Sequence, residues 1–149
     1  MTKNRLTKYS VRYLVIHCAA TPPDMEIGVK EIDRWHKAKG WFGCGYHYVI
    51  NRAGELEHGR DINTIGAHAR GYNHVSIGIC LVGGVNENNE PEDNFNEGQM
   101  LQLEAVLEEL QDIYPLAVIV GHNELDPHKE CPSFNVQRWL DDTWPETNN

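Results

Sequence analysis

The sequence predicts an α/β fold in which a single domain, residues 1–149, contains a central mixed β-sheet of about five strands flanked by about three helices. Short apolar runs typical of buried strands alternate along the chain with segments of helical periodicity, and this alternation favours a sheet covered by helices. A domain of this length buries about 70% of the surface that its unfolded chain exposes. It therefore has enough core to fold without disulfides or a metal ion.

The first half of the chain predicts a strand, a helix and a hairpin. Residues 12–20, RYLVIHCAA, form an apolar run typical of a buried strand. Residues 29–40 repeat large side chains at helical spacing, and Gly40 is the expected end of that helix. The repeated side chains are Val29, Ile32, Trp35 and His36. Residues 46–60 predict a hairpin, because two β-rich runs flank Ala53-Gly54.

The second half predicts two buried strands, at 75–84 and 116–121, and two helices. The longer helix is expected from Glu97 to Tyr114, because Asn96 and Gln99 have the spacing of a capping box. Its expected buried stripe consists of Met100, Leu103, Leu107, Leu110 and Tyr114. The final helix is expected over 133–144, with Ser133 as its N-cap.

Composition excludes several classes of function. The net charge of −9 argues against direct nucleic-acid binding and against anionic membranes, because both need clustered Lys and Arg. No apolar run is long enough to span a bilayer, and YLVI near the N-terminus is too short for the core of a signal peptide. The four Cys show no framework spacing, so they are expected as free thiols or metal ligands.

Three side chains predict a metal site. His17 and His122 each lie near the end of a predicted core strand, and ligands commonly bind at such strand ends. Cys131 follows His122 by nine residues across Asp126-Pro127, a turn signal that can fold the loop back. Two imidazoles and a thiolate suit zinc, and three protein ligands leave the fourth position open, as in catalytic sites.

Each of these residues also has an ordinary structural explanation. A single His at a strand end is more often a hydrogen-bonded polar residue than a ligand, and an isolated Cys usually packs as a small apolar side chain. A blue-copper centre also uses two His and a Cys, but it needs a weak axial Met. The three Met of this chain, Met1, Met25 and Met100, are poorly placed for that role.

Five segments resemble the zinc-dependent N-acetylmuramoyl-L-alanine amidases of the peptidoglycan recognition family, and most closely the phage lysozymes of T-odd podoviruses, which are amidases. The segments are VIHCAAT, EIDRWHKAKGW, GYHYVINRAGELEHGRD, GAHARGYNHVSIGICLVGG and HKECPSF. They occur in the family's order with similar gaps, from about Tyr13 to Trp139. The resemblance implies one amidase domain over residues 1–149.

The resemblance also implies roles for individual residues. It makes His17, His122 and Cys131 the ligands of one Zn²⁺ per chain, and it makes Tyr46 of GYHY and Lys129 of HKEC the catalytic residues. Either of the latter two can donate to developing charge or assist proton transfer. His68 is implied to bind substrate or to support the metal site. His36, His47, His58, His74 and His128 are interpreted as structural or surface residues.

The resemblance implies that the substrate is the amide bond between N-acetylmuramic acid and L-Ala in bacterial peptidoglycan, and that the protein acts as an endolysin. We expect a monomer that accumulates in the host cytoplasm and acts on the cell wall after release. Some phage relatives also bind the phage RNA polymerase, which the resemblance therefore adds as a second role.

Three other classes of function stay open from the residues alone. The first is a non-catalytic peptidoglycan-binding module, against which the presence of Cys131 argues. The second is a muramidase with paired carboxylates, although no Asp or Glu stands out from the solvated background. The third is a cysteine hydrolase in which a His activates Cys131, and dependence on metal separates that enzyme from the amidase.

Overall fold

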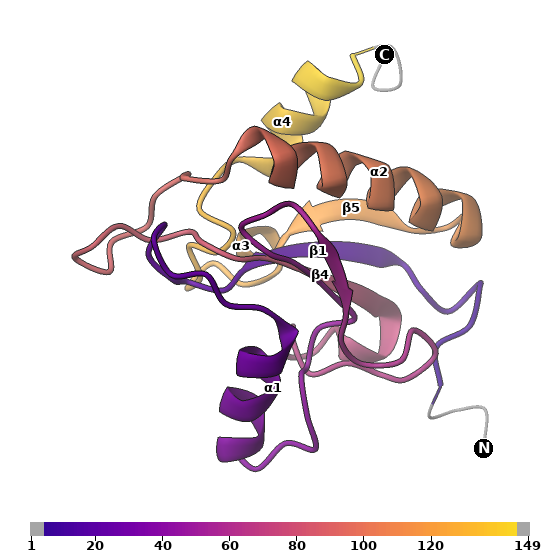
Figure 1. Ribbon diagram of the computed structural model, residues 1–149. Coiled ribbons are helices and arrows are strands. Elements are labelled where there is room, and N and C mark those ends of the chain that lie inside the picture. The colour runs from indigo at the N-terminus through magenta and orange to yellow at the C-terminus, as the bar shows by residue number, and fades with distance from the viewer. Residues whose placement is uncertain (1–4, 146–149) are drawn as a thin grey trace.

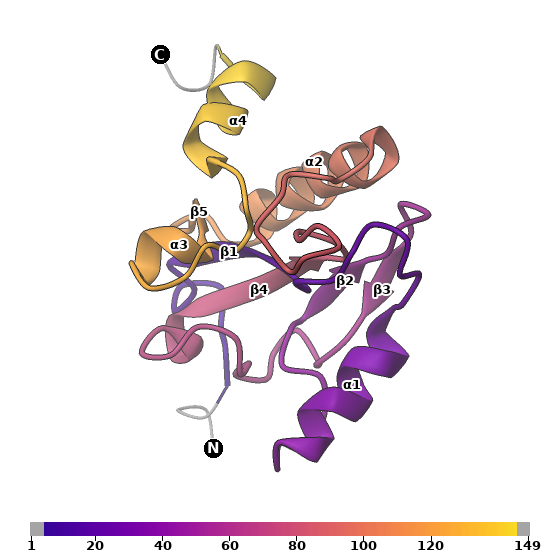
Figure 2. The ribbon, with the colours of Figure 1, turned by 90° about the vertical axis from the view of Figure 1, so that its left-hand side faces the viewer.

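The computed structural model describes residues 5–145 and is built around one five-stranded sheet. The strands are β1 (Tyr13–Cys18), β2 (Tyr48–Ile50), β3 (Leu56–His58), β4 (Ser76–Leu81) and β5 (Val118–Gly121). Their order across the sheet is β3-β2-β4-β1-β5, which is visible in Figure 2. β4 pairs in parallel with β1 and β2, β5 pairs in parallel with β1, and only the β2–β3 hairpin is antiparallel. The predicted mixed sheet is confirmed.

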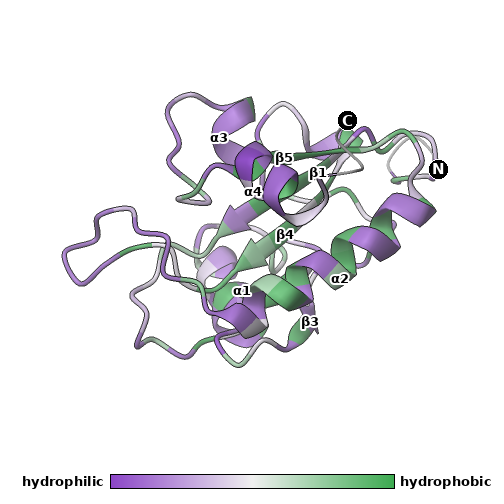
Figure 3. Ribbon diagram, turned by 90° about the horizontal axis from the view of Figure 1, so that it is seen from above, coloured by the Kyte–Doolittle hydropathy of each residue, from purple (hydrophilic) through white to green (hydrophobic). Residues whose placement is uncertain are grey.

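Helices cover both faces of the sheet (Figure 1). They are α1 (Val29–Ala38), α2 (Glu97–Ile113), α3 (His122–Leu125) and α4 (Val136–Thr143). On one face, α2 and α4 pack against Leu14, Ile16 and Ile79 of the central strands. On the other face, Ile32 of α1 packs with Val49 and Cys80. Because both faces are covered, all six residues of β4 are buried, and Figure 3 shows the central strands as mostly hydrophobic.

The long helix α2 follows the predicted pattern. Asn96 Oδ1 accepts a hydrogen bond from Gln99 N at 2.9 Å, and Gln99 Oε1 accepts one from Asn96 N at 3.2 Å, so the capping box is present. Leu103, Leu107 and Leu110 are buried under the helix. Burying each such side chain contributes about 1.5–3 kcal/mol, which is what holds α2 on the sheet.

Helix α1 forms within the predicted segment, with Ile32 and His36 buried and Trp35 42% exposed. Two details of the other helices differ from the sequence-based expectation. Helix α4 begins later than expected, with Asn135 rather than Ser133 as its N-cap. Ser133 has a φ of +74°, and its hydroxyl donates to Gly84 O at 2.8 Å, so it belongs to the preceding loop. The short helix α3, directly after β5, was not predicted.

Within residues 5–145, no helix combines the length and apolar character needed to cross a membrane.

Candidate active site

The two histidines predicted as ligands are brought together by the pairing of β1 with β5. In this parallel ladder, Ile16 lies beside Gly121, so the next residues along the two chains are His17 and His122. Their ring centroids are 4.4 Å apart. His17 is 2% exposed at the end of the central strand, and His122 opens α3 at the cleft surface. The carboxyl end of the sheet therefore places two imidazoles side by side.

Cys131 reaches the same place because its loop folds back as the Asp126-Pro127 signal predicts. Lys129 N donates to Asp126 O at 3.1 Å, which closes a turn, and Asn123 N donates to Cys131 O at 2.8 Å. The amide of Cys18 then donates to Cys131 Sγ at 2.9 Å, so the end of β1 holds the thiol directly.

These three side chains form a group that can bind a metal ion. One ligand atom of each, from His17, His122 and Cys131, lies within 4.8 Å of the other two. In the described part of the chain, no other group of His, Cys, Asp and Glu was found with this geometry. Zinc–ligand bonds are about 2.0–2.3 Å long, so atoms at this separation can share one ion after a small contraction.

The protonation states also suit a metal ion. Burial, followed by the nearby His68 and His122, lowers the pKa of His17 well below its usual value. Burial and the charge of Lys129 lower the pKa of His122. Both rings are therefore neutral at pH 7, as ligands must be. The Cys18 thiol and burial raise the pKa of Cys131 well above its usual value, so this thiol keeps its proton until a bound metal ion displaces it.

Tyr46 lies beside His17, and Lys129 lies in the cleft next to His122. The Tyr46 ring lies 5.0 Å from the His17 ring, and burial raises its pKa well above the usual value, so its hydroxyl keeps its proton and can donate. Lys129 is exposed and lines a cleft of about 510 Å³ together with His122 and His68. Trp41, Arg70, Asn73 and Asp126 also line this cleft.

His68 makes the most direct contact with a candidate ligand. Its Nδ1 lies 2.8 Å from Nε2 of His17, and its Nε2 lies 3.2 Å from Ser76 Oγ. It also lines the cleft, so contact with substrate is compatible with its position. The sequence analysis did not identify Ser76 or the cleft residue Trp41. For Trp41 the available signal was an aromatic residue directly after Gly40, the expected end of the helix.

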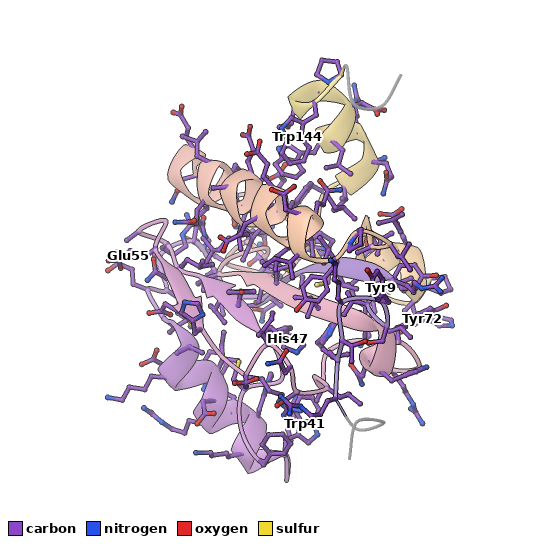
Figure 4. All side chains as sticks on the ribbon, turned by 90° about the vertical axis from the view of Figure 1, so that its right-hand side faces the viewer. Tyr9, Trp41, His47, Glu55, Tyr72 and Trp144 are labelled. Atoms are coloured by element: carbon purple, nitrogen blue, oxygen red, sulfur yellow. The ribbon has the colours of Figure 1, made fainter. Side chains whose placement is uncertain are left out.

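The remaining histidines lie away from the three candidate ligands. His47 accepts from Gly78 N at 3.0 Å through Nδ1 and donates to Thr64 O at 2.7 Å through Nε2; Figure 4 shows it on the α1 side of the sheet. His36 accepts from Gly45 N at 2.8 Å. His58, His74 and His128 are exposed.

Comparison with known proteins identifies the family. Residues 7–134 match the N-acetylmuramoyl-L-alanine amidase family, so the chain belongs to that family and is an N-acetylmuramoyl-L-alanine amidase. It is 47% identical over 141 residues to the endolysin of Enterobacteria phage K11, covering 94% of this chain and 93% of that one. It is also 47% identical over 126 residues to the endolysin of Escherichia phage T7, covering 85% of this chain and 83% of that one.

A solved structure agrees with this assignment. The amidase LysC from Clostridium intestinale URNW superposes with a TM-score of 0.78 at 27% identity, covering 93% of this chain and 89% of that one. The expected amidase and its α/β fold are thereby confirmed, in preference to a muramidase or a non-catalytic module.

Proposed function

We propose that this protein is an endolysin that hydrolyses the amide between N-acetylmuramic acid and L-Ala in bacterial peptidoglycan, with one Zn²⁺ held by His17, His122 and Cys131. The observation that carries the proposal is the convergence of these three ligand atoms, within 4.8 Å of one another, in a chain of the amidase family. The relatives named endolysin support the biological role.

The donor set fits zinc better than other common ions. Two neutral imidazoles and a thiolate are borderline-soft ligands, which Zn²⁺ accepts and Mg²⁺ or Ca²⁺ does not. When bound, zinc supplies Lewis-acid chemistry, because it activates water near neutral pH and polarises a carbonyl group. Three protein ligands leave room for both functions at the open side of the site.

The side chains of this protein supply the remaining chemistry. Tyr46 keeps its phenolic proton at neutral pH because burial raises its pKa, so it can donate a hydrogen bond to a substrate oxygen that becomes negative. Lys129 brings a positive charge to the mouth of the cleft and can donate to the same oxygen or to the departing amine of L-Ala. The cleft of about 510 Å³ that Lys129 and His122 share offers space for the muramoyl-peptide.

The wider biology follows from this proposal. We expect residues 1–149 to act as one monomeric domain that is made in the host cytoplasm and reaches the wall after release. Binding to a phage RNA polymerase stays a prediction from the resemblance.

The test combines metal analysis with digestion of purified cell wall. We expect one zinc per chain, and release of free α-amino groups of L-Ala without new reducing sugar ends. His128→Ala is a matched control, because His128 is exposed and lies outside the ligand group. Full activity in protein shown to be free of metal would refute the zinc assignment and favour a cysteine hydrolase. New reducing ends would refute the bond that we propose is cleaved.

A further inference from the structure

A chain of polar contacts runs from the protein backbone through two side chains to His17. It starts at Tyr72 O, continues through Ser76 Oγ and the ring of His68, and ends at His17 Nε2. Figure 4 shows Tyr72 near the start of β4, the strand that Ser76 begins. No charged group takes part, so the direction of each hydrogen bond depends on where each proton lies.

The first link settles the direction of the others. Ser76 Oγ lies 2.8 Å from Tyr72 O, and a carbonyl oxygen can only accept, so the single hydroxyl proton of Ser76 points to Tyr72. Toward His68 the hydroxyl oxygen can then only accept. The contact of 3.2 Å between Ser76 Oγ and His68 Nε2 therefore places the proton of the neutral His68 ring on Nε2.

The contact between His68 and His17 determines which ring nitrogen of His17 carries the proton. With its proton on Nε2, His68 presents a lone pair at Nδ1, which lies 2.8 Å from His17 Nε2. His17 must donate across this contact, so its own ring proton is on Nε2. The lone pair of His17 is then on Nδ1, the one ring nitrogen that His68 leaves free.

We propose that His68 and Ser76 are positioning residues that hold His17 as its Nε2–H tautomer, so that Nδ1 of His17 faces the metal ion. The inference rests on the proposed zinc site. It adds which nitrogen of His17 binds the ion and which two residues keep that nitrogen free of a proton. If His68 Nδ1 donated to His17 Nε2 instead, His17 would carry its proton on Nδ1 and could not bind a cation there. Fixing the tautomer of a ligand through its second nitrogen is a general way to tune a metal site.

The surroundings of His68 hold its ring in this position. Asn73 Oδ1 accepts from the amides of His68 and Ala69, each at 2.9 Å, which fixes the backbone. Two glycines make room for the ring: a Cβ added to Gly78 would lie 2.6 Å from His68 Cγ, and one added to Gly66 would lie 2.7 Å from His68 Cδ2. The His68 ring therefore lies in a slot between the backbone at Gly66 and the backbone at Gly78. This packing fixes the ring in its contact with His17.

The experiment reads the tautomer before any metal is added. In metal-free wild-type protein at neutral pH, two-bond ¹⁵N–¹H NMR of the histidine rings is expected to show His17 protonated on Nε2 and unprotonated on Nδ1. Ser76→Ala removes the acceptor for His68, so His17 is expected to become a mixture of tautomers. A wild-type His17 protonated on Nδ1 would overturn the proposal, whether or not any variant folds.

Zinc affinity, measured by competition with a chelator, is the second readout. His68→Leu keeps a side chain of similar size but no acceptor, and affinity is expected to fall about 10–100-fold. His68→Asn restores an acceptor at the position of Nδ1 and is expected to bind close to wild type. His74→Leu is the control, because His74 is exposed on the same segment.

A purely space-filling role predicts the opposite order, with the Leu variant close to wild type, and that order would overturn the proposal. If wild-type protein bound no zinc, the proposed function would fail, while the NMR spectrum would still decide the hydrogen-bond chain.

Discussion

The close packing of Gly78 against His68 makes Gly78→Ala a sensitive test of how the candidate metal site is supported. The added Cβ would lie 2.6, 2.7 and 2.8 Å from three atoms of the His68 ring, whereas ordinary contacts begin at 3.4 Å. Backbone surrounds the slot, so the ring must move by about 0.8 Å, and such overpacking costs about 1–3 kcal/mol. A shift of that size along the contact with His17 would lengthen it from 2.8 Å to about 3.6 Å, beyond hydrogen-bond range.

We therefore expect Gly78→Ala to lower both the melting temperature and the zinc affinity, the latter by about 10-fold or more. Thermal unfolding of metal-free protein and chelator competition measure the two effects separately. Gly98→Ala is the matched control, because its Cβ would meet only Asn96 Oδ1, at 3.4 Å, and alanine favours the helix there. Zinc affinity equal to wild type in Gly78→Ala, despite lower stability, would refute the coupling that we describe.

Four further outcomes follow from the same structure. Tyr46→Phe and Lys129→Ala should each lower turnover on muramoyl-peptide by about 10²–10³ while zinc stays bound, because each removes a donor and not a ligand; near-normal turnover in both would move the catalytic roles elsewhere. Cys131→Ala should lose zinc and activity together, and retention of stoichiometric zinc would contradict its role as ligand. Chelation should abolish lysis but leave the circular dichroism spectrum of the fold, since the core forms without metal; global unfolding would show that the metal is structural. Finally, burial lowers the pKa of His36 and of His47, so the unfolded chain takes up protons first as pH falls below about 6.5. The free energy of unfolding, measured in urea, should therefore be smaller at pH 5.5 than at pH 7.5, and equal values would contradict this account.

The sequence predicts best those elements whose signals are local. The start of α2 is an example, because Asn96 and Gln99 satisfy each other's backbone within one turn. The start of α4 was missed for the complementary reason: Ser133 is a good N-cap residue by type, but the loop that carries Cys131 uses its hydroxyl to bind Gly84 O. Helix α3 has only four residues, too few to show a period.

The candidate site was predicted in part. His17, His122 and Cys131 could be chosen because strand ends and a turn signal indicate where they gather. Tyr46 and Lys129 depended on the family resemblance, since a strand Tyr and a loop Lys have no local signal. The contact of His68 with His17 joins residues 51 positions apart and becomes visible only when β1 and β4 pair.

The in-register pairing of β1 with β5 bears on how this enzyme can change during evolution. Ile16 and Gly121 are paired in the ladder, and His17 and His122 directly follow them. The distance between the two histidines therefore depends on the register of β1 and β5. Deleting one residue from β5 would slide His122 by about 3.3 Å and turn its side chain to the opposite face of the sheet. Homologues should therefore tolerate many substitutions in this strand but no insertion or deletion, whereas the exposed turn at residues 87–90 is free to vary in length.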